Sequence, residues 1–443
     1  MKIKLQMKKI TALILFFGII ISASAALFSC TPGIGGTSNP ASPEALLATV
    51  LGESSKEFDT VADYLDFWGF PEFSRSKLIT LEKTYRKHFV SELPSPYDKA
   101  RAVGEYFITN FYTGEKKSID ETTDMLIDSF VRTSGDKYSI YRTAKEYTDY
   151  TTDMSGSFVG IGVTVRYNGE TGEILVEKVH DGGGAKDAGI LPGDYITKVN
   201  GENVADIGYE KAVSNIKGEE NTTVNVSVLC GDTEITFTII RRQIVENSAT
   251  FEIKDGIAYI EITSFKNNTA SQFKSAVDEA LKMGAKGIIY DLRDNHGGYL
   301  DTVIEMLDYI APKGTMLASF TNGYMDPKYS KSAHSLSLPT VVICNESTAS
   351  AAELFTAAIR DFSNMGYFPA TIVGEKTFGK GIMQNTYLFN DKSSITMTVA
   401  YYNPPSGVNY HDVGITPDVT VSVGEGDPQK DAAYSEIAKL INK

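Results

Sequence analysis

The chain has 443 residues, 42% of them hydrophobic and 22% charged, which is ordinary globular composition and long enough for about three domains. It carries 42 basic and 56 acidic side chains, a formal net charge of -14. This balance excludes nucleic acid as an expected partner, because a polyanionic backbone would be repelled by the protein surface.

The first thirty residues have the pattern of an export signal. Lysines at positions 2, 4, 8 and 9 precede an apolar run over residues 13–21, and small residues follow. The apolar run is too short for a stop-transfer helix and lacks the flanking charge of one. We therefore predict a signal peptide over residues 1–29.

Cys30 ends the motif "LFSC", which resembles a bacterial lipobox, and the Pro/Gly/Ser-rich stretch "TPGIGGTSNPASP" follows it. The resemblance implies a lipid on Cys30, a flexible tether over residues 30–44, and a protein anchored in the bacterial cell envelope at its periplasmic face. A plain secretory signal with an incidental cysteine is the alternative. Cys230 and Cys344 lie in apolar strand-like runs and are expected to be buried free thiols.

Apolar residues recur at helical spacing between residues 45 and 150, for example at Val61, Leu65 and Trp68. This pattern predicts an N-terminal helical domain. Its aromatic side chains are expected in the core or in a contact between subunits, so this domain is the candidate region for a homo-oligomer. These residues are Trp68, Phe70, Phe73, Tyr106, Phe107, Phe111 and Tyr112.

Glycines and β-branched residues replace helix formers from "SGSFVGIGVTVRY" onward. The segments "FVGIGV" and "AGILPGDYITKVNGENV" resemble a PDZ domain, which implies a mostly β domain over residues 155–243 that holds a free peptide C-terminus. Backbone N–H groups of a Gly-rich turn suit a carboxylate, and the neighbouring strand edge can pair with a peptide. The candidate peptide-binding residues are Phe158, Gly160, Ile161 and Gly162. The glycines would alternatively serve only a tight strand entry.

Strand-like and helix-like runs alternate after residue 243, which predicts parallel strands joined by crossover helices. We expect an α/β core domain over residues 244–443 that ends in a short C-terminal helix, so that the whole chain has a multidomain α/β fold. Active sites in such folds gather beyond the carboxyl ends of the strands, where both "DLRDNHGG" and "NESTAS" fall.

The stretch "NESTASAAELF" offers three hydroxyls, on Ser347, Thr348 and Ser350. Apolar residues after Ser350 trace one helical face, and Ser350 with Glu353 matches a capping box, so this stretch alone favours a structural cap. No familiar base lies nearby in the sequence, which has five His and neither a G-x-S-x-G elbow nor a Cys/His cluster with metal spacing. We predict no metal and no cofactor.

A lysine is the candidate base. Lys380 lies between two glycines ahead of a strand-like run, where its amine can approach another loop closely. Burial would have to lower its pKa from about 10.4 to roughly 7 or 8 before it could accept a serine proton. Lys376 is the rival, although the adjacent Glu375 favours its protonated form. From this stretch alone, a solvent-facing turn lysine is the simpler interpretation of Lys380.

Separated segments between about residue 130 and residue 422 resemble, in order, the carboxyl-terminal processing proteases, a family of Ser/Lys endopeptidases with an inserted PDZ domain. The resemblance implies a serine endopeptidase that cleaves unfolded or flexible-tailed proteins recognised through their free C-termini. The segments are "GDKYSIY", "GSFVGIGV", the PDZ turn, "YDLRDNHGG", "STASAAELFTAAIRD", "VGEKTFGKGIMQ" and "YYNPPSGVNYHDVGITPDV".

The resemblance assigns a role to several single residues. The nucleophile falls on Ser350 and the base on Lys380. Gln384, four residues further on, matches the position that orients the lysine, and Asp361 matches an acidic position near the site. The capping interpretation of Ser350 can coexist with this assignment, because a free helix N-terminus favours negative character on an attacking oxygen.

We expect the oxyanion hole to consist of the backbone N–H of Gly297 or Gly298 together with that of Ala351. Glycine after a strand permits close approach, and the start of a helix presents free donors. The sequence departs from the family at His296, which replaces the usual proline beside these glycines. That change removes no predicted catalytic group.

Two other functions were weighed. A lipid-anchored scaffold that binds peptides through its PDZ domain and has lost catalysis would lack the serine or the lysine, and both are present. A lipase-like hydrolase that uses "NHGG" for its oxyanion lacks the nucleophile elbow. The protease is therefore the favoured function, and the scaffold is its main alternative.

Overall fold

A computed structural model describes residues 42–52, 56–169, 171–231 and 233–442. The predicted signal peptide (1–29), Cys30 and all but the last residues of the predicted tether (30–44) lie outside the described residues. In the part of the chain that is described, no helix is long and apolar enough to cross a membrane.

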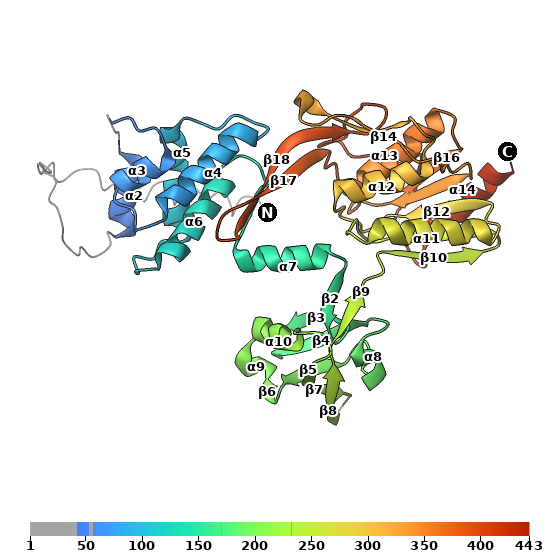
Figure 1. Cartoon of the computed structure of the whole chain (residues 1–443), viewed down its shortest axis with the longest axis horizontal. Helices are drawn as coiled ribbons and strands as arrows, with labels where there is room; N and C mark the ends of the chain where they lie inside the picture. The colour runs from blue at the N-terminus through green and yellow to red at the C-terminus, as the bar shows by residue number, and fades with distance from the viewer. Residues whose placement is uncertain (1–41, 53–55, 170, 232, 443) are drawn as a thin grey trace, which may run out of the picture. The chain divides into compact units, whose positions relative to one another are not determined.

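The N-terminal region is helical (Figure 1), and helices α3, α5 and α6 begin at residues whose side chains cap them. The side chains of Thr60, Ser95 and Ser118 each accept a backbone N–H of the helix that follows, which satisfies a donor the helix itself leaves free. The predicted aromatic residues Trp68 and Phe107 are buried in its core. The helices are α2 (Pro43–Leu51), α3 (Val61–Phe67), α4 (Arg75–His88), α5 (Pro96–Asn110) and α6 (Ile119–Arg132).

A short strand interrupts the region that helical spacing assigned to helices alone. Strand β1 (Ile140–Arg142) pairs antiparallel with the distant strand β18 (Ser394–Asn403), with Ile140 opposite Thr396. Apolar side chains of β18 belong to the same buried cluster as the N-terminal helices. Helix α7 (Ala144–Met154) follows and begins with the capping box of Thr143 and Glu146.

The next region is mostly β, as predicted for a PDZ domain. Its main sheet runs in the order β3-β4-β5-β7-β8, all antiparallel, and β2 pairs with β9 beside it. The strands are β2 (Ser157–Gly160), β3 (Val163–Asn168), β4 (Glu173–Val179), β5 (Tyr195–Val199), β6 (Glu202–Asn203), β7 (Thr223–Cys230), β8 (Thr233–Ile240) and β9 (Arg242–Val245). The helices are α8 (Gly184–Ala188), α9 (Val204–Ile207) and α10 (Tyr209–Ile216).

The C-terminal region contains the predicted parallel sheet with crossover helices. The strand order is β10-β11-β12-β15-β16-β19. Among the described pairs of this sheet, β10 and β11 are antiparallel and the others are parallel. The strands are β10 (Ala249–Lys254), β11 (Ile257–Ile262), β12 (Gly287–Asp291), β15 (Thr340–Cys344), β16 (Ala370–Gly374) and β19 (Val419–Thr420). The helices are α11 (Thr269–Lys282), α12 (Leu300–Ile310), α13 (Ala351–Asn364) and α14 (Pro428–Ile441).

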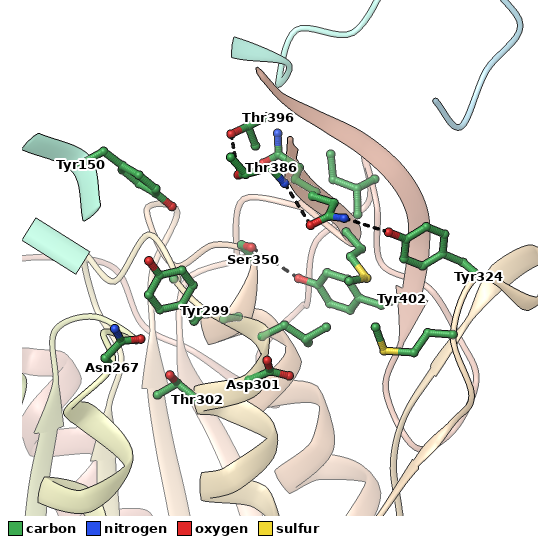
Figure 2. Close-up of a pocket in the computed structure, with 18 of the residues that line it drawn as sticks. Tyr150, Asn267, Tyr299, Asp301, Thr302, Tyr324, Ser350, Thr386, Thr396 and Tyr402 are labelled. Carbon is green, nitrogen blue, oxygen red and sulfur yellow. Dashed lines mark hydrogen bonds between the residues drawn. The ribbon is translucent and has the colours of Figure 1, made fainter. Parts of the chain in front are cut away.

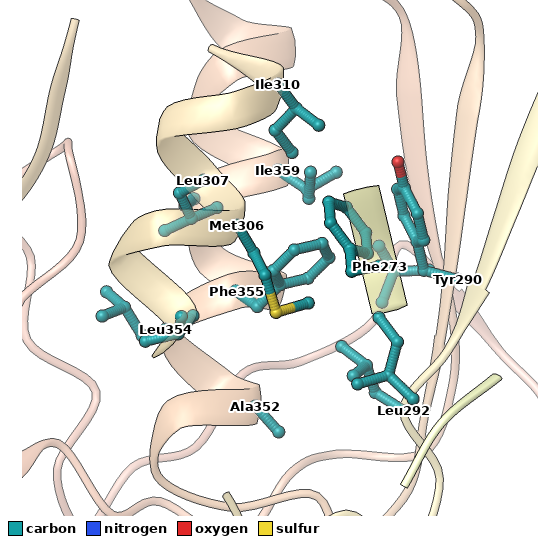
Figure 3. Close-up of a cluster of buried hydrophobic side chains, with 14 of the residues drawn as sticks. Phe273, Tyr290, Leu292, Met306, Leu307, Ile310, Ala352, Leu354, Phe355 and Ile359 are labelled. Atoms are coloured by element: carbon teal, nitrogen blue, oxygen red, sulfur yellow. The ribbon is translucent and has the colours of Figure 1, made fainter. Parts of the chain in front are cut away.

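Helices cover both faces of this sheet. Figure 3 shows Phe273 of α11, Met306 of α12 and Phe355 of α13 packed together with Tyr290 of β12 in one buried cluster. The neighbouring Ile289 points to the other face, where it joins a second cluster with α14. Both faces are buried, which explains why the central strands are continuous apolar runs.

A second, antiparallel sheet in this region was not predicted. It consists of β13 (Met316–Phe320), β14 (Lys328–Tyr329), β17 (Ile382–Leu388) and β18, together with β1. Strand β17 pairs with β18 over its whole length. The pairing brings the residues that follow Lys380 next to the strand that carries Tyr402.

The parallel pairing also places two loops side by side. Strands β12 and β15 are in register up to Asp291 opposite Ile343, so the loops after them leave the same edge of the sheet. Cys230 and Cys344 are free, as expected, but of these two only Cys344 is buried, and Cys230 at the end of β7 is partly exposed.

Candidate active site

The three hydroxyls of "NESTAS" have different environments. Thr348 is fully buried, and its Oγ1 accepts the N–H of Asn345 at 2.9 Å and donates to the carbonyl of Leu292 at 2.8 Å. Thr348 therefore joins the two loops and is unavailable for attack. Ser347 lines a pocket that it shares with His296, whereas Ser350 lines a different pocket.

Ser350 adopts a backbone conformation that L-residues rarely adopt, with φ 58° and ψ -119°. Such a conformation costs about 1–3 kcal/mol and persists only where the surroundings impose it. Two groups hold it here. The Ser350 N–H donates to Glu353 at 2.9 Å, and the Tyr410 hydroxyl donates to the Ser350 carbonyl at 3.3 Å. The Ser350 side chain then lies at the start of α13, where the sequence placed the beginning of the helix.

The Glu353 side chain connects the two loops that carry Ser350 and Lys380. Its carboxylate is fully buried and accepts hydrogen bonds from the backbone N–H groups of Ser350, Gly379 and Lys380, at 2.9, 2.7 and 2.7 Å, and from the Thr377 hydroxyl at 2.6 Å. One carboxylate thereby fixes the backbone of both predicted catalytic residues. From the sequence, Glu353 was assigned only a capping role.

Lys380 is half-buried, and its Nζ donates to Gln384 Oε1 at 2.9 Å. Burial lowers the pKa of Lys380, although the carboxylates of Asp136 and Glu353 partly oppose this by favouring the ammonium. Within the described residues the amine makes no hydrogen bond to Ser350, a common arrangement for catalytic pairs in the absence of substrate. The rival Lys376 is exposed. Of these two lysines, Lys380 is therefore the one whose amine is partly shielded from solvent.

Gln384 joins Lys380 to the backbone of Tyr138. Its Oε1 accepts from Lys380, and its Nε2 donates to the backbone carbonyl of Tyr138 at 2.6 Å. The Tyr138 ring lies beside the same amine, with Nζ 4.9 Å from the ring centroid. Tyr138 comes from "GDKYSIY", which the sequence comparison singled out without giving it a role.

Tyr402 is a site residue that the sequence reasoning missed. Its hydroxyl lies 3.5 Å from Ser350 Oγ and 3.2 Å from the Lys380 carbonyl, and Figure 2 shows it pointing toward the serine. Burial raises the pKa of Tyr402, so the hydroxyl stays a proton donor at neutral pH. The tyrosines of "YYNPPSGVNY" were the available signal, but nothing in the sequence shows that β18 runs past Ser350.

The oxyanion-hole candidates lie beside Ser350 but are not equivalent. A Cβ on Gly297 would lie 2.8 Å from that of Ser350, so only glycine fits there. The Gly297 N–H is already used, because it donates to Asn295 Oδ1 at 2.8 Å. Gly298 and Ala351 both line the pocket with Ser350. The N–H groups of Gly298 and Ala351 are therefore the remaining candidate donors for the oxyanion hole.

Asp361 does not lie near the reacting groups, so its assignment is corrected. It follows Ala351 by ten residues of the same helix, about 15 Å along the helix axis at 1.5 Å per residue. Its carboxylate accepts the Ser406 N–H at 2.8 Å, and burial raises its pKa. Asp361 thus fixes the turn after β18. His296 is exposed beside Ser347 rather than beside Ser350.

The pocket at Ser350 has a volume of about 600 Å³. Helix α7 contributes Tyr147 and Tyr150, and the start of α12 contributes Tyr299 and Asp301. Strands β17 and β18 contribute a further wall, in which Figure 2 shows Thr386, Thr396 and Tyr402. This volume is in the range of ligand-binding clefts and would accommodate several residues of an extended peptide.

The four predicted peptide-binding residues gather at a second, smaller pocket. Phe158, Gly160, Ile161 and Gly162 line it with residues of β3 and α10. The Ile161 side chain is 1% exposed and packs in the core of this domain, so only its backbone is available to a ligand. The other lining residues are Val163, Val165, Val213, Ile216 and Lys217.

Comparisons with known proteins agree with this organisation. The family model "Peptidase family S41" matches residues 256–421, and the model "PDZ domain" matches residues 151–229. The chain is 34% identical over 320 residues to a probable CtpA-like serine protease of Staphylococcus aureus (strain bovine RF122 / ET3-1). The matched region covers 71% of this chain and 63% of the relative.

A second relative gives the same result. A probable CtpA-like serine protease of Staphylococcus epidermidis (strain ATCC 12228 / FDA PCI 1200) is 35% identical over 312 residues, 70% of this chain and 62% of its own length. The chain therefore spans less than two thirds of these relatives. Among solved structures, a photosystem II D1 C-terminal processing protease is 23% identical and matches 78% of this chain and 92% of its own, with a TM-score of 0.46.

Proposed function

The chain belongs to the carboxyl-terminal processing proteases of peptidase family S41, and from this premise we propose that it is a serine endopeptidase with Ser350 as nucleophile and Lys380 as base. The observation that carries the proposal is the buried Glu353 carboxylate, which binds the backbone N–H groups of both residues. It holds a strained serine and a partly dehydrated lysine on neighbouring loops beside one pocket.

The proposed reaction begins with neutral Lys380. Its Nζ turns from Gln384 and accepts the proton of Ser350, and the serine oxygen attacks the carbonyl carbon of a peptide bond. The oxyanion that forms accepts hydrogen bonds from the N–H groups of Gly298 and Ala351. The Lys380 ammonium then gives its proton to the leaving amine, and an acyl-enzyme remains. The same lysine then takes a proton from water, the hydroxide attacks the acyl carbon, and the lysine gives that proton to Ser350 Oγ as the bond between the acyl carbon and this oxygen breaks and the second product leaves.

Substrate selection is proposed to depend on the PDZ domain. Its pocket is lined mainly by apolar side chains, including Val165, Val213 and Ile216, and Lys217 adds a positive charge at its rim. These features suit an extended peptide with an apolar last residue and a free carboxylate. The substrates would be unfolded proteins or proteins with flexible tails, because one chain must reach both the PDZ pocket and Ser350.

The cellular setting is also a proposal. The basic start, the apolar run and the lipobox-like "LFSC" support export and lipid attachment at Cys30. The protein would then act from a membrane anchor in the bacterial envelope, on its periplasmic face. A homo-oligomer through the N-terminal helices remains a prediction, and sedimentation of the full chain would test it.

The proposed function is tested with an unfolded protein as substrate. The full chain is incubated with a reduced model protein that carries an apolar C-terminal tail, and with the same protein whose tail ends in an amide. If the protein with the free C-terminus is cleaved, and the amidated protein is cleaved more slowly, the result supports Ser/Lys cleavage with C-terminal recognition. Peptide binding without cleavage would instead support the scaffold. Equal cleavage of both forms would remove the PDZ domain from substrate selection.

A further inference from the structure

Tyr138 lies in a short loop between α6 and β1, and that loop is rigidly held. The Asp136 carboxylate accepts the Tyr138 N–H at 2.9 Å and the Ser139 hydroxyl at 2.8 Å. Two residues after Tyr138, Ile140 begins the ladder of β1 with β18. The loop therefore has a fixed position beside β17 and β18, the strands that follow Lys380.

The backbone of Tyr138 fixes one side of Gln384. A carbonyl oxygen can only accept a hydrogen bond, so the Gln384 amide must turn its Nε2 toward Tyr138, at 2.6 Å. The Gln384 Oε1 is then the atom that faces Lys380 Nζ, at 2.9 Å. An amide in the opposite orientation would turn its NH₂ toward the lysine amine and its oxygen toward the Tyr138 carbonyl, so the amine would lose its acceptor and two acceptor oxygens would face each other.

The side chain of Tyr138 acts on the amine itself. Lys380 Nζ lies 4.9 Å from the centroid of the ring, so the ring occupies space that water would otherwise fill. The contact uses the aromatic face and does not involve the Tyr138 hydroxyl. Tyrosine and phenylalanine should therefore serve equally well at this position, whereas a flexible aliphatic side chain should not.

We propose that Tyr138 is a positioning residue for the base: its carbonyl orients Gln384, and its ring keeps water away from the Lys380 amine until substrate arrives. The inference rests on the proposed function, in which Lys380 is the base. It gives the loop between the N-terminal helices and β1 a part in the catalytic apparatus, although this loop lies outside the residues matched by the peptidase family model.

Several charged groups face Lys380 and the Tyr138 ring. The carboxylates of Asp136 and Glu353 favour the ammonium of Lys380, and burial outweighs them. On the ring, the Lys137 amine lies 4.9 Å from the centroid, and the His411 ring centroid lies 6.0 Å away. Asp412 faces both, 3.9 Å from the Lys137 amine and 3.5 Å from His411.

Loss of the ring would remove a cation–π contact that favours the ammonium, but it would also admit water to the amine; because burial is the largest influence on this pKa, the Lys380 pKa would rise. The base is active when neutral, so activity would begin at a higher pH. A shift of about one unit in this pKa lowers the neutral fraction about tenfold on the acidic side of the profile.

The test compares Tyr138→Leu with the matched variant Tyr138→Phe. Steady-state kcat/KM on an unfolded protein substrate is measured from pH 6 to pH 10 with the full chain. Tyr138→Phe should reproduce the parent profile. Tyr138→Leu should move the acidic limb about one unit upward, lose about tenfold in kcat/KM near neutrality, and recover most of it at high pH. Equal loss at every pH, or no loss, would overturn the proposal.

A second measurement separates this inference from the proposed function. In the Ser350→Ala background, lysines are reductively methylated with ¹³C, and the Lys380 resonance, identified by its absence in Lys380→Arg, is titrated by NMR. Adding Tyr138→Leu should raise the titration midpoint of that resonance, whereas Tyr138→Phe should leave it unchanged. Equal midpoints in the two variants would overturn the inference even if the parent chain proves to be a protease. Absence of proteolysis in the parent, with the NMR shift present, would reject only the function.

Discussion

Burial lowers the pKa of both Lys99 and Lys380, but the two amines have different neighbours. Lys99 in α5 is fully buried, and burial lowers its pKa to about 7, while burial also lowers the pKa of Lys380. The Lys99 amine donates to the Phe130 carbonyl at 2.7 Å and to Thr133 Oγ1 at 2.9 Å. It thereby satisfies acceptors near the C-terminal end of α6.

The comparison shows that a lowered lysine pKa does not by itself mark a base. Lys99 lies among the buried side chains of the N-terminal helices. The loop of Lys380, by contrast, is hydrogen-bonded through Glu353 to the strained Ser350, which lines an open pocket. The difference lies in what the amine can reach. A shifted pKa indicates function only when a reacting group that substrate can reach lies near the titrating residue.

Substitution by methionine should separate the two lysines most clearly, through its effect on kcat. Lys380→Met should reduce kcat on an unfolded protein by roughly 10³-fold or more, because the serine loses its proton acceptor. Lys99→Met should leave kcat within a few fold, since Lys99 lies in the helical core. Both variants are checked for folding by thermal melting. Similar activity losses in both would remove the distinction between them.

A smaller effect is expected from the tyrosine that faces the nucleophile. Tyr402→Phe removes a donor 3.5 Å from Ser350 Oγ and should lower kcat by about tenfold to a hundredfold, because the developing charge on that oxygen loses a partner. Tyr401→Phe, one residue earlier on β18, is the control and should be near the parent value. Equal rates for Tyr402→Phe and the parent would mean that the hydroxyl serves only the Lys380 carbonyl.

The smallest effect concerns stability and belongs to Lys99. Its pKa is near 7 when folded and about 10.5 when unfolded, so between these values the unfolded chain binds more protons. The free energy of unfolding should therefore rise with pH across this window, by at most roughly 1.4 kcal/mol per pH unit.

Urea unfolding at pH 7, 8 and 9, compared between the parent and Lys99→Met, measures this contribution. The parent should gain stability relative to the variant as the pH rises. Parallel pH dependences in the two proteins would show that Lys99 titrates normally in the folded state.

The sequence predicted the parts of the site that local motifs encode. Ser350, Lys380 and Gln384 came from the resemblance of separate segments, and the start of α13 followed from helical spacing and the capping pattern. The parallel order of the core strands followed from their alternation with helices. These features depend on residues close together in the chain or on a fixed order of motifs.

The missed features depend on contacts between distant segments. The pairing of Ile140 with Thr396 joins positions far apart in the chain, and a strand as short as β1 carries no readable periodicity. Tyr138 and Tyr402 reach the site only because of this sheet. Asp361 was misplaced for the opposite reason: its motif position was clear, but ten residues of α13 separate it from the start of the helix beside Ser350.

The central claim, that Ser350 is the nucleophile among three neighbouring hydroxyls, is tested most directly by digestion of unfolded casein with matched variants of the full chain. Ser350→Ala should abolish cleavage with the fold intact, while Ser347→Ala should cleave at a rate close to the parent's. Retained cleavage by Ser350→Ala, or loss with Ser347→Ala alone, would contradict the account.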